Sequence, residues 1–123
     1  MTIFDAISRV DHEKPNVCDQ VVKIRWLSQL DWQIRELMGL FQGEEGAAFS
    51  GYGPDTPLST SLLAPQGNEA MYQRWLEAQI DLANGEYDRY NASILLFQTE
   101  FDRFARECFR TGLSRGSGKP FLY

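Results

Sequence analysis

The chain offers few side chains that could form a catalytic or metal-binding group. His12 is the only histidine among the 123 residues, and it lies in a polar stretch between Asp11 and Glu13. A general base or a metal ligand needs partner side chains, and no cysteine or second histidine stands at ligand spacing from His12. The pattern therefore favours an exposed, structural histidine over a functional one.

Acidic side chains could in principle pair as general acid and general base. Acids on helix surfaces are usually only solvated, and the sequence shows no accompanying pocket signature. The glycine-rich stretches also lack the Gly-x-x-x-x-Gly-Lys pattern that binds phosphate. We therefore expect no enzyme, no cofactor and no metal. The acids considered are Glu44 and Glu45, and, on expected helix surfaces, Asp31, Glu36, Glu77 and Asp81.

The cysteines and the N-terminal segment bear on where the protein folds. Cys18 and Cys108 lie in different kinds of segment, and nothing marks the chain as secreted, so a disulfide is not expected. Residues 1–10 contain Asp5 and Arg9 and lack the apolar run of a signal peptide. No apolar run is long enough to span a membrane. We expect a cytoplasmic protein without a membrane contact.

The longest element expected from the sequence is a helix over residues 87–108, which stops near Thr111 and Gly112. Apolar side chains recur along it at alternating spacings of three and four, which is typical of a helix packed along its length against other helices. Polar side chains fill the positions between them, so the opposite face can remain in water. The apolar seam consists of Tyr87, Tyr90, Ile94, Phe97, Phe101, Phe104 and Cys108.

Three further helices complete the prediction. Each has an apolar stripe at helical spacing, with residues near its ends that start or stop a helix. The third and fourth helices are expected to form a helical hairpin, and the second to lie across its open face. The expected elements are a short helix over 3–10 with Thr2 as N-cap, a helix from Cys18 or Asp19 to about Gln42, and a helix from an Asn68 cap to the Asn84-Gly85 turn.

Three apolar residues of the second helix, Val21, Trp32 and Leu40, lie off its main stripe. Either this helix is buried on two sides, or part of it is an interface in an assembly. Single hydrophobic residues are also common on ordinary protein surfaces. Trp32 and Leu40 are the candidate subunit–subunit contacts.

Residues 44–67 form a long connection rich in Gly, Pro, Ser and Thr. Within it, 47–52 and 58–63 could pair as a short β-hairpin around a central turn signal. A connection of this length in a compact helical domain is uncommon and is often functional, although a passive crossover between two helices is the alternative. The candidate contact residues of this loop are Phe49, Tyr52 and Leu58.

The expected fold is therefore all-α: a small helical bundle of one short and three longer helices. Residues 1–112 make up the domain, with the loop 44–67 in it, and 113–123 form a flexible basic tail. Seven basic and sixteen acidic residues precede position 103, whereas five basic and one acidic residue follow from there. An acidic body with a basic tail indicates that the tail makes contacts. The net charge of -5 argues against a protein that coats nucleic acid.

Four stretches of the sequence carry a family resemblance. They are TIFDAISRVD (2–11), KIRWLSQLD (23–31), FSGYGPDT (49–56) and YQRWLEAQIDLANGEYDRYN (72–91), with the Trp-Leu-Glu-Ala-Gln-Ile-Asp and Asn-Gly-Glu-Tyr runs the most specific. They resemble small proteins encoded in the structural modules of tailed phages and of prophages of gut Firmicutes. Those proteins look like head-tail connectors, also called adaptor or head-completion proteins, and the likeness spans most of the chain.

The resemblance implies a virion protein that joins the portal vertex as a homo-oligomeric ring and extends the DNA channel toward the tail. Its partners would be the portal protein and a neck, stopper or tail-completion protein, with the free subunit either a monomer or already assembled. DNA would pass nearby without specific binding, which an acidic channel wall suits. The protein would occupy the host cytoplasm during assembly and then the head–tail junction of the virion.

In such proteins a helical bundle forms the ring wall, a long loop faces the channel or the next component, and a C-terminal extension grips the portal. The tail of this chain could make that contact through charge complementarity and a buried apolar anchor. Its candidate residues are Arg115 and Lys119 for charge, and Phe121, Leu122 and Tyr123 for the anchor.

A different class of function remains open at this point: a small nucleic-acid-binding helical protein, such as a small terminase subunit. Arg103, Arg106 and Arg110 would supply its basic helix, but the early helices show no compact helix-turn-helix signal. A regulator that binds a helix of a host protein is a third possibility. The tryptophans favour a core role over base stacking, because Trp26, Trp32 and Trp75 stand at helical spacing among aliphatic residues.

Overall fold

The computed structural model of the chain describes residues 1–42 and 49–115. Four helices form this part of the protein, and none of the described residues belongs to a strand, so the predicted helical class is confirmed. The helices are α1 (Ile3–Glu13), α2 (Gln20–Gln42), α3 (Glu69–Ala83) and α4 (Tyr87–Arg115).

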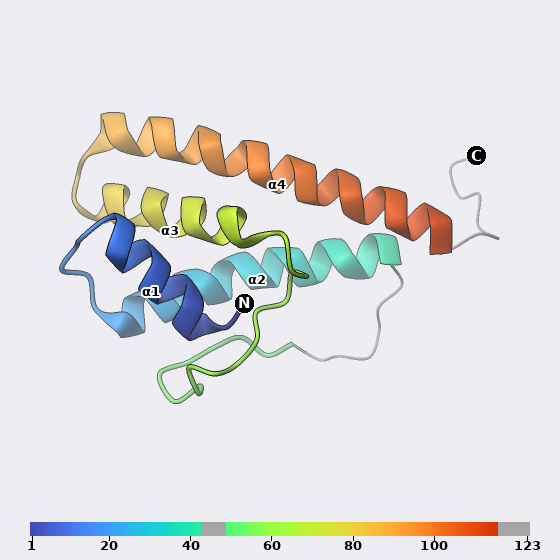
Figure 1. The fold of residues 1–123 in the computed structure, drawn as a ribbon, viewed down its shortest axis with the longest axis horizontal. Coiled ribbons are helices and arrows are strands. Elements are labelled where there is room, and N and C mark those ends of the chain that lie inside the picture. Colours follow the sequence, from blue (N-terminus) through green and yellow to red (C-terminus); the bar gives the residue numbers. More distant parts are fainter. Residues whose placement is uncertain (43–48, 116–123) are drawn as a thin grey trace.

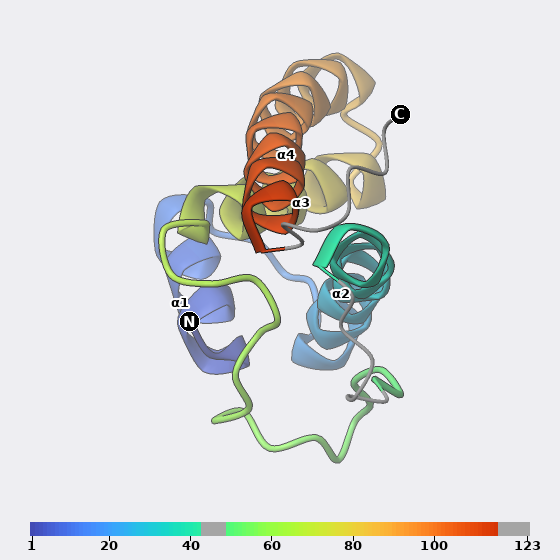
Figure 2. The ribbon, with the colours of Figure 1, turned by 90° about the vertical axis from the view of Figure 1, so that its right-hand side faces the viewer.

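The helices pack around a shared core. Figure 1 shows α2, α3 and α4 along the long axis of the molecule, with α1 crossing beside α2 and α3. In Figure 2, α4 lies at the top, and α1 and α2 lie below it on either side. The first described part of the connection to α3, residues 49–60, runs beneath these two helices. The expected hairpin of α3 and α4 is present, and its turn uses Gly85 at a φ of 72°, which glycine adopts readily.

Helix α1 follows the predicted pattern closely. The Thr2 hydroxyl accepts from the Asp5 amide and the Asp5 carboxylate accepts from the Thr2 amide, so both groups of a capping box are in place. The helix continues three residues beyond the predicted end at Val10, and the Lys14 amide closes it by donating to the Val10 carbonyl. Its buried face is the predicted one: Ile3, Ala6, Ile7 and Val10.

The predicted β-hairpin is wrong for the described part of the loop. Residues 58–62 bind the start of the chain instead, because the amides of Ile3 and Phe4 donate to the carbonyls of Thr60 and Leu58 at 3.0 Å each. The first amides of a helix have no partner within it, and these two find one in the loop. The Leu62 amide then donates to the Met1 carbonyl at 2.9 Å. The loop is thus tied to α1.

The aromatic seam of α4 is confirmed over its second half and wrong at its first residue. Phe97, Phe104 and Cys108 are buried, whereas the Tyr87 side chain is 64% exposed. Tyr87 stands in the first turn of α4, directly after the tight turn from α3. Rings stack along the α3–α4 contact, with centroids of Trp75 and Phe97 5.0 Å apart. Such contacts stabilise a core beyond the area they bury.

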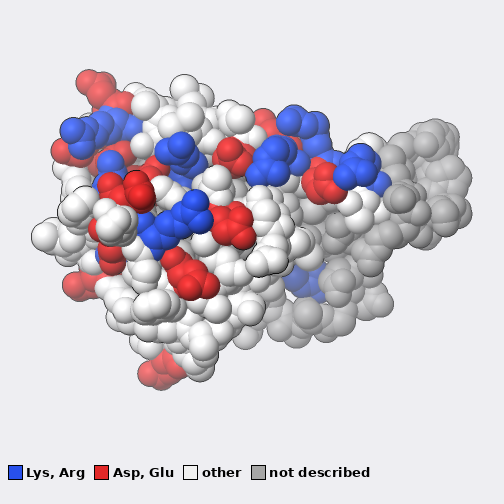
Figure 3. Space-filling model, viewed as in Figure 1, with Lys and Arg blue, Asp and Glu red and all other residues white. Residues whose placement is uncertain are grey.

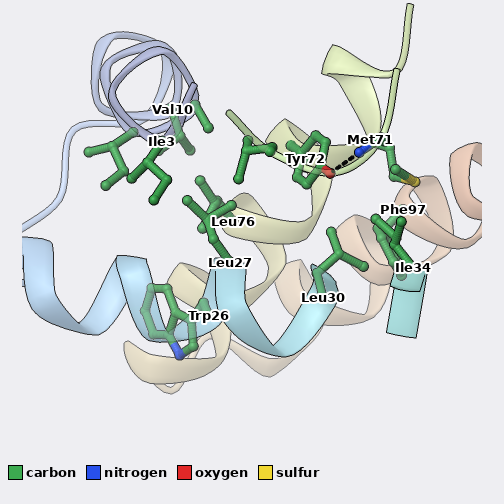
Figure 4. Close-up of a cluster of buried hydrophobic side chains, with 14 of the residues drawn as sticks. Ile3, Val10, Trp26, Leu27, Leu30, Ile34, Met71, Tyr72, Leu76 and Phe97 are labelled. Atoms are coloured by element: carbon green, nitrogen blue, oxygen red, sulfur yellow. Dashed lines mark hydrogen bonds between the residues drawn. The ribbon is translucent and has the colours of Figure 1, made fainter. Parts of the chain in front are cut away.

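The core joins side chains from all four helices. Figure 4 shows them converging between α1, α2 and α3, with Phe97 reaching in from α4. The labelled members are Ile3, Val10, Trp26, Leu27, Leu30, Ile34, Met71, Tyr72, Leu76 and Phe97.

Two helix ends differ from the sequence prediction. Helix α4 runs to Arg115 and passes through Gly112, the expected stop, because one glycine inside a helix costs only about 1 kcal/mol relative to alanine. At the start of α3, Asn68 stands at the N-cap position without a side-chain cap bond, and its amide group donates to the Pro65 carbonyl. The Gly67 amide is instead bound by the Glu69 carboxylate.

Candidate interaction surface

Three aromatic side chains singled out in the sequence come together on one side of α2. The rings of Trp32 and Phe49 meet edge to face with centroids 5.0 Å apart, and those of Phe49 and Tyr52 do so at 5.1 Å. Trp32 remains 50% exposed, and Phe49 and Tyr52 are partly exposed. We call these three residues the aromatic surface. It joins a candidate subunit contact, Trp32, to two candidate loop contacts.

The loop backbone lies tightly against α2 at this surface. Gly51 has a φ of 88°, and a Cβ added there would lie 3.0 Å from Oγ of Ser28 and 3.1 Å from Nε1 of Trp32. The next amide, that of Tyr52, donates to the Ser28 hydroxyl at 2.9 Å. Only glycine combines this backbone angle with so close an approach. The structure therefore explains why the central position of the FSGYG run is a glycine.

A buried carboxylate holds Tyr52 from below. Asp31 is fully buried and accepts three hydrogen bonds: from the Tyr52 hydroxyl at 2.5 Å, the Tyr72 hydroxyl at 2.7 Å and the Leu63 amide at 3.1 Å. The Tyr72 hydroxyl also accepts from the Ala64 amide at 2.9 Å, as the dashed line in Figure 4 marks. The carboxylate thus connects α2, the loop and α3.

The expectation that Asp31 is a solvated acid on a helix surface is wrong. Leu27 and Ile34, one turn before and after Asp31 on α2, are buried, as is the preceding Leu30, and Asp31 shares their face. The signal was available in the sequence, because an acid at these spacings from three core positions points inward. What the sequence did not supply was the set of donors that allows the acid to remain there. Asp81 of α3, also expected on a surface, is fully buried as well.

Burial raises the pKa of the Asp31 carboxyl above its ordinary value, and the hydrogen bonds from Tyr52, Tyr72 and Leu63 oppose that rise. The pKa values of the two phenols are also raised, chiefly by burial and further by the adjacent carboxylate. Both tyrosines therefore remain neutral donors. Hydrogen-bond donors thus surround one acceptor group, and this arrangement connects parts of the structure.

Leu40 lies farther along α2, beside a groove between α2 and α4. Its side chain is 73% exposed. The groove has a volume of about 570 Å³, and a second hollow of about 380 Å³ shares two of its lining residues. We call the first hollow the α2–α4 groove. It is lined by Gln33, Glu36, Leu37, Leu40 and Phe101, and the second by Trp32, Gln33, Arg35, Glu36 and Gly39.

Because the two hollows share Gln33 and Glu36, Trp32 and Leu40 border one continuous strip of α2. Both side chains are exposed, so the interpretation that α2 is buried on two sides is wrong at these positions. Leu58 does not join this strip. Its side chain packs on the core and its carbonyl binds the Phe4 amide, so the structure places it at the start of α1.

A second exposed apolar region lies on α4 and was missed in the sequence. Leu95 and Leu96 are 62% and 47% exposed, outside the face of α4 that carries the buried Phe97 and Phe104. In Figure 2, the first part of the described loop, residues 49–60, lies at the bottom of the view and α4 at the top, whereas residues 65–67 reach α4, where Arg103 donates to the Gly67 carbonyl. The α4 leucines and the aromatic surface thus belong to separate elements of the fold. In the sequence, both leucines stand outside the regular apolar seam of α4, and this position could have indicated that they are exposed.

On the face that Figure 3 shows, basic and acidic side chains are interspersed over the upper and left part. Two of the three arginines expected to form a basic cluster are paired within α4, Arg103 with Glu100 at 2.8 Å and Arg110 with Glu107 at 2.5 Å. Arg115 is the last residue of α4. The remaining candidate tail residues, Lys119, Phe121, Leu122 and Tyr123, lie outside the described residues.

The described residues include no group of histidine, cysteine and acidic side chains that could hold a metal ion. His12 is exposed, and Cys18 and Cys108 are free thiols. Among the helices of the described part, none is long and apolar enough to cross a membrane. Trp26 and Trp75 pack in the core, with the Trp75 indole donating to the Trp26 carbonyl at 2.8 Å, so the predicted core role is confirmed for these two.

Comparison with known proteins gave no match to any family model, curated protein or solved structure.

Proposed function

We propose that the protein is a virion structural protein of a tailed phage, a head-tail connector that docks on the portal as a ring. The resemblance of its sequence to such connectors supports this function. The structural observation that carries it is the presence of two exposed apolar regions on different helices, Trp32 and Leu40 on α2 and Leu95 and Leu96 on α4. A helical bundle of this kind would form the wall of the ring.

A ring requires two different surfaces on each subunit. Its contacts are heterologous, so one face of a subunit meets another face of the next, and rotation closes the set. The strip bordered by Trp32 and Leu40 and the α4 region of Leu95 and Leu96 are two exposed regions on different helices, and they would supply the two halves of such a contact. A twofold dimer would use one patch against itself and leave the other exposed.

The portal contact is assigned to the C-terminal segment 113–123, which begins in the last residues of α4. Arg115 and Lys119 supply positive charge and Phe121, Leu122 and Tyr123 an apolar anchor. One short segment binds weakly, because ordering it costs free energy, and a ring makes the grip strong by engaging many copies at once. DNA passes the acidic body of the ring without specific contacts.

The test is a pull-down with the portal protein encoded in the same genome. The full chain is compared with a version that ends at Arg115, which keeps α4 complete. Binding that disappears on truncation supports the connector and assigns the tail its role. Binding that survives places the portal contact on the helices or the loop. No binding by either version at high protein concentration contradicts the proposal, and a salt-dependent shift of duplex DNA would then favour a nucleic-acid-binding protein.

The ring contact has its own test. Leu40→Glu places a charge on the strip of α2 and should prevent ring formation on the portal while the subunit stays folded. Val17→Glu is the matched control, because Val17 is 93% exposed outside the helices. Mass measurement of the assembled complexes distinguishes rings from single bound subunits. If rings form equally well with Leu40→Glu, α2 does not take part in the contact between subunits.

A further inference from the structure

Asp31 and Trp32 are adjacent in α2, but their side chains occupy opposite environments. Asp31 is fully buried and Trp32 is half exposed. A chain of contacts outside the helix connects the two again. The Asp31 carboxylate binds the Tyr52 hydroxyl, the Tyr52 ring packs on Phe49, and the Phe49 ring packs on Trp32. The four side chains and the α2 backbone thus form a closed circuit.

The loop part of this circuit is restrained at its backbone and at the Tyr52 ring. Its backbone is fixed to α2 by the bond from the Tyr52 amide to the Ser28 hydroxyl and by the close approach at Gly51. The Tyr52 ring is directed by the bond from its hydroxyl to Asp31. Phe49, an apolar side chain at the edge of the described segment, is held between the Tyr52 and Trp32 rings.

A buried carboxylate is an energetically costly way to hold the loop in place. Burying a charge carries a desolvation penalty, and well-packed apolar residues can often replace a buried charge without loss of stability. The three donors around Asp31 come from the loop and α3, and each would lose its acceptor if the carboxylate were replaced by an aliphatic side chain. The carboxylate thus specifies one arrangement of the loop, where an apolar group would allow several.

We propose that Asp31 is a positioning residue for the aromatic surface. Its carboxylate fixes Tyr52, and through Tyr52 it holds Phe49 against Trp32 before any partner arrives. The partner of this surface is a second copy of the chain, so the inference rests on the proposed ring. A surface that is already ordered loses less conformational entropy when it binds, and the neighbouring copy therefore meets a preformed contact.

The first experiment uses the free subunit and NMR contacts between the Trp32 and Phe49 rings. Tyr52→Phe removes only the hydroxyl that binds Asp31 and leaves the bonds from Tyr72 and Leu63 in place. The Trp32–Phe49 contacts should weaken strongly while the helical signal stays unchanged. Asp31→Asn is the second variant and should weaken the same contacts. Tyr87→Phe, at an exposed position, is the matched control and should leave them intact.

A purely stabilising role for Asp31 predicts a different result. In that case Tyr52→Phe would lower the unfolding midpoint but leave the Trp32–Phe49 contacts as they are. Unchanged ring contacts in both Tyr52→Phe and Asp31→Asn overturn the positioning role. This result is obtained without any partner, so it stands whether or not the chain forms a ring.

The second experiment measures assembly of the subunit on the portal. Tyr52→Phe should weaken assembly about tenfold, the size expected when a contact must be ordered during binding. Trp32→Ala removes the side chain that the circuit positions, so Trp32→Ala with Tyr52→Phe should assemble no worse than Trp32→Ala alone. If the losses of assembly caused by the two substitutions add up in the double variant, the proposed coupling between Tyr52 and Trp32 is contradicted. If the unaltered chain does not assemble, the proposed function fails, and the NMR contacts still decide whether Asp31 positions the rings.

Discussion

The Tyr72 hydroxyl donates a 2.7 Å hydrogen bond to Oδ1 of Asp31 and so joins two helices across 41 positions of sequence. The same hydroxyl accepts from the Ala64 amide, so a single oxygen connects α2, α3 and the loop. Each of these groups is buried. The stability of this junction therefore depends on complete pairing, because a buried polar group without a partner carries its full desolvation penalty.

Tyr72→Phe tests this pairing. It leaves the ring in the core but deprives Asp31 of a donor and Ala64 of an acceptor, so we expect a loss of about 1–3 kcal/mol in the free energy of unfolding. Urea denaturation followed by circular dichroism measures it. Tyr90→Phe, on the partly exposed part of the α4 seam, is the control for loss of a tyrosine hydroxyl. Equal effects of the two variants would contradict the importance of the junction.

The pH dependence of stability should carry the signature of Asp31. Its pKa is raised in the folded state, so the folded protein takes up a proton at a higher pH than the unfolded chain does. This group therefore adds stability as the pH falls through its folded pKa, and the gain is complete below the ordinary value of 3.8. Asp31→Asn lacks this effect.

The difference in unfolding free energy between the unaltered protein and Asp31→Asn should therefore grow on acidification from neutral pH. Urea denaturation at a series of pH values measures it. Carboxyls whose pKa is lowered, such as Asp5 and Glu69, act in the opposite direction but are common to both proteins, so they cancel in the difference. A difference that shrinks on acidification would mean that the hydrogen bonds outweigh burial at Asp31.

Gly51→Ala should be costly for a local reason. The backbone angle of Gly51 is unfavourable for other residues, and a methyl group there would press on Ser28 and Trp32. We expect a loss above about 1 kcal/mol in the free energy of unfolding. Gly53→Ala is the matched control, since no atom lies within 4 Å of an added Cβ there. A neutral Gly51→Ala would show that the loop can move away from α2 without cost.

The ion pair between Lys14 and Asp81 joins the end of α1 to α3. Nζ of Lys14 lies 3.0 Å from Oδ1 of the fully buried Asp81, although the geometry is not that of a hydrogen bond, and the Ser93 hydroxyl donates to Oδ2 at 2.8 Å. Lys14→Met leaves this carboxylate without its cation and should cost about 1–3 kcal/mol of unfolding free energy.

Arg89→Met is the control for Lys14→Met, because it removes an exposed pair with Glu86 and should leave stability unchanged within error. Chemical denaturation of both variants gives the comparison. Lys14→Met combined with Asp81→Asn should recover part of the loss, because the uncompensated charge is then absent. A double variant less stable than Lys14→Met would contradict this account.

The features of the fold that depend on neighbours within one or two turns were predictable from the sequence. The Thr2 cap, the buried face of α1 and the Gly85 turn all follow from residues three or four positions apart. The four helices themselves were found for the same reason. The sequence left the exposure of Trp32 and Leu40 open, and the core role that it favoured for Trp32 is wrong, because that side chain is 50% exposed.

Features that depend on distant partners were not predictable. Asp31 is buried because Tyr52 and Tyr72, 21 and 41 positions away, supply donors to it. Residues 58–62 bind α1 because the first amides of that helix need acceptors, and propensity alone suggested a hairpin instead. For the candidate surface, the sequence indicated Trp32 and Phe49 separately, but only the tertiary structure brought their rings together.

The hydrogen bonds between the loop and the start of α1 also bear on biosynthesis. A helix of eleven residues is marginal alone in water, and in the folded protein the carbonyls of Leu58 and Thr60 bind the first amides of α1. During translation the N-terminal helix must therefore remain undocked until Leu62 has left the ribosome. Its apolar face, with Ile3 and Val10, stays available to chaperones for that interval, although in the finished protein it is among the most deeply buried parts of the chain.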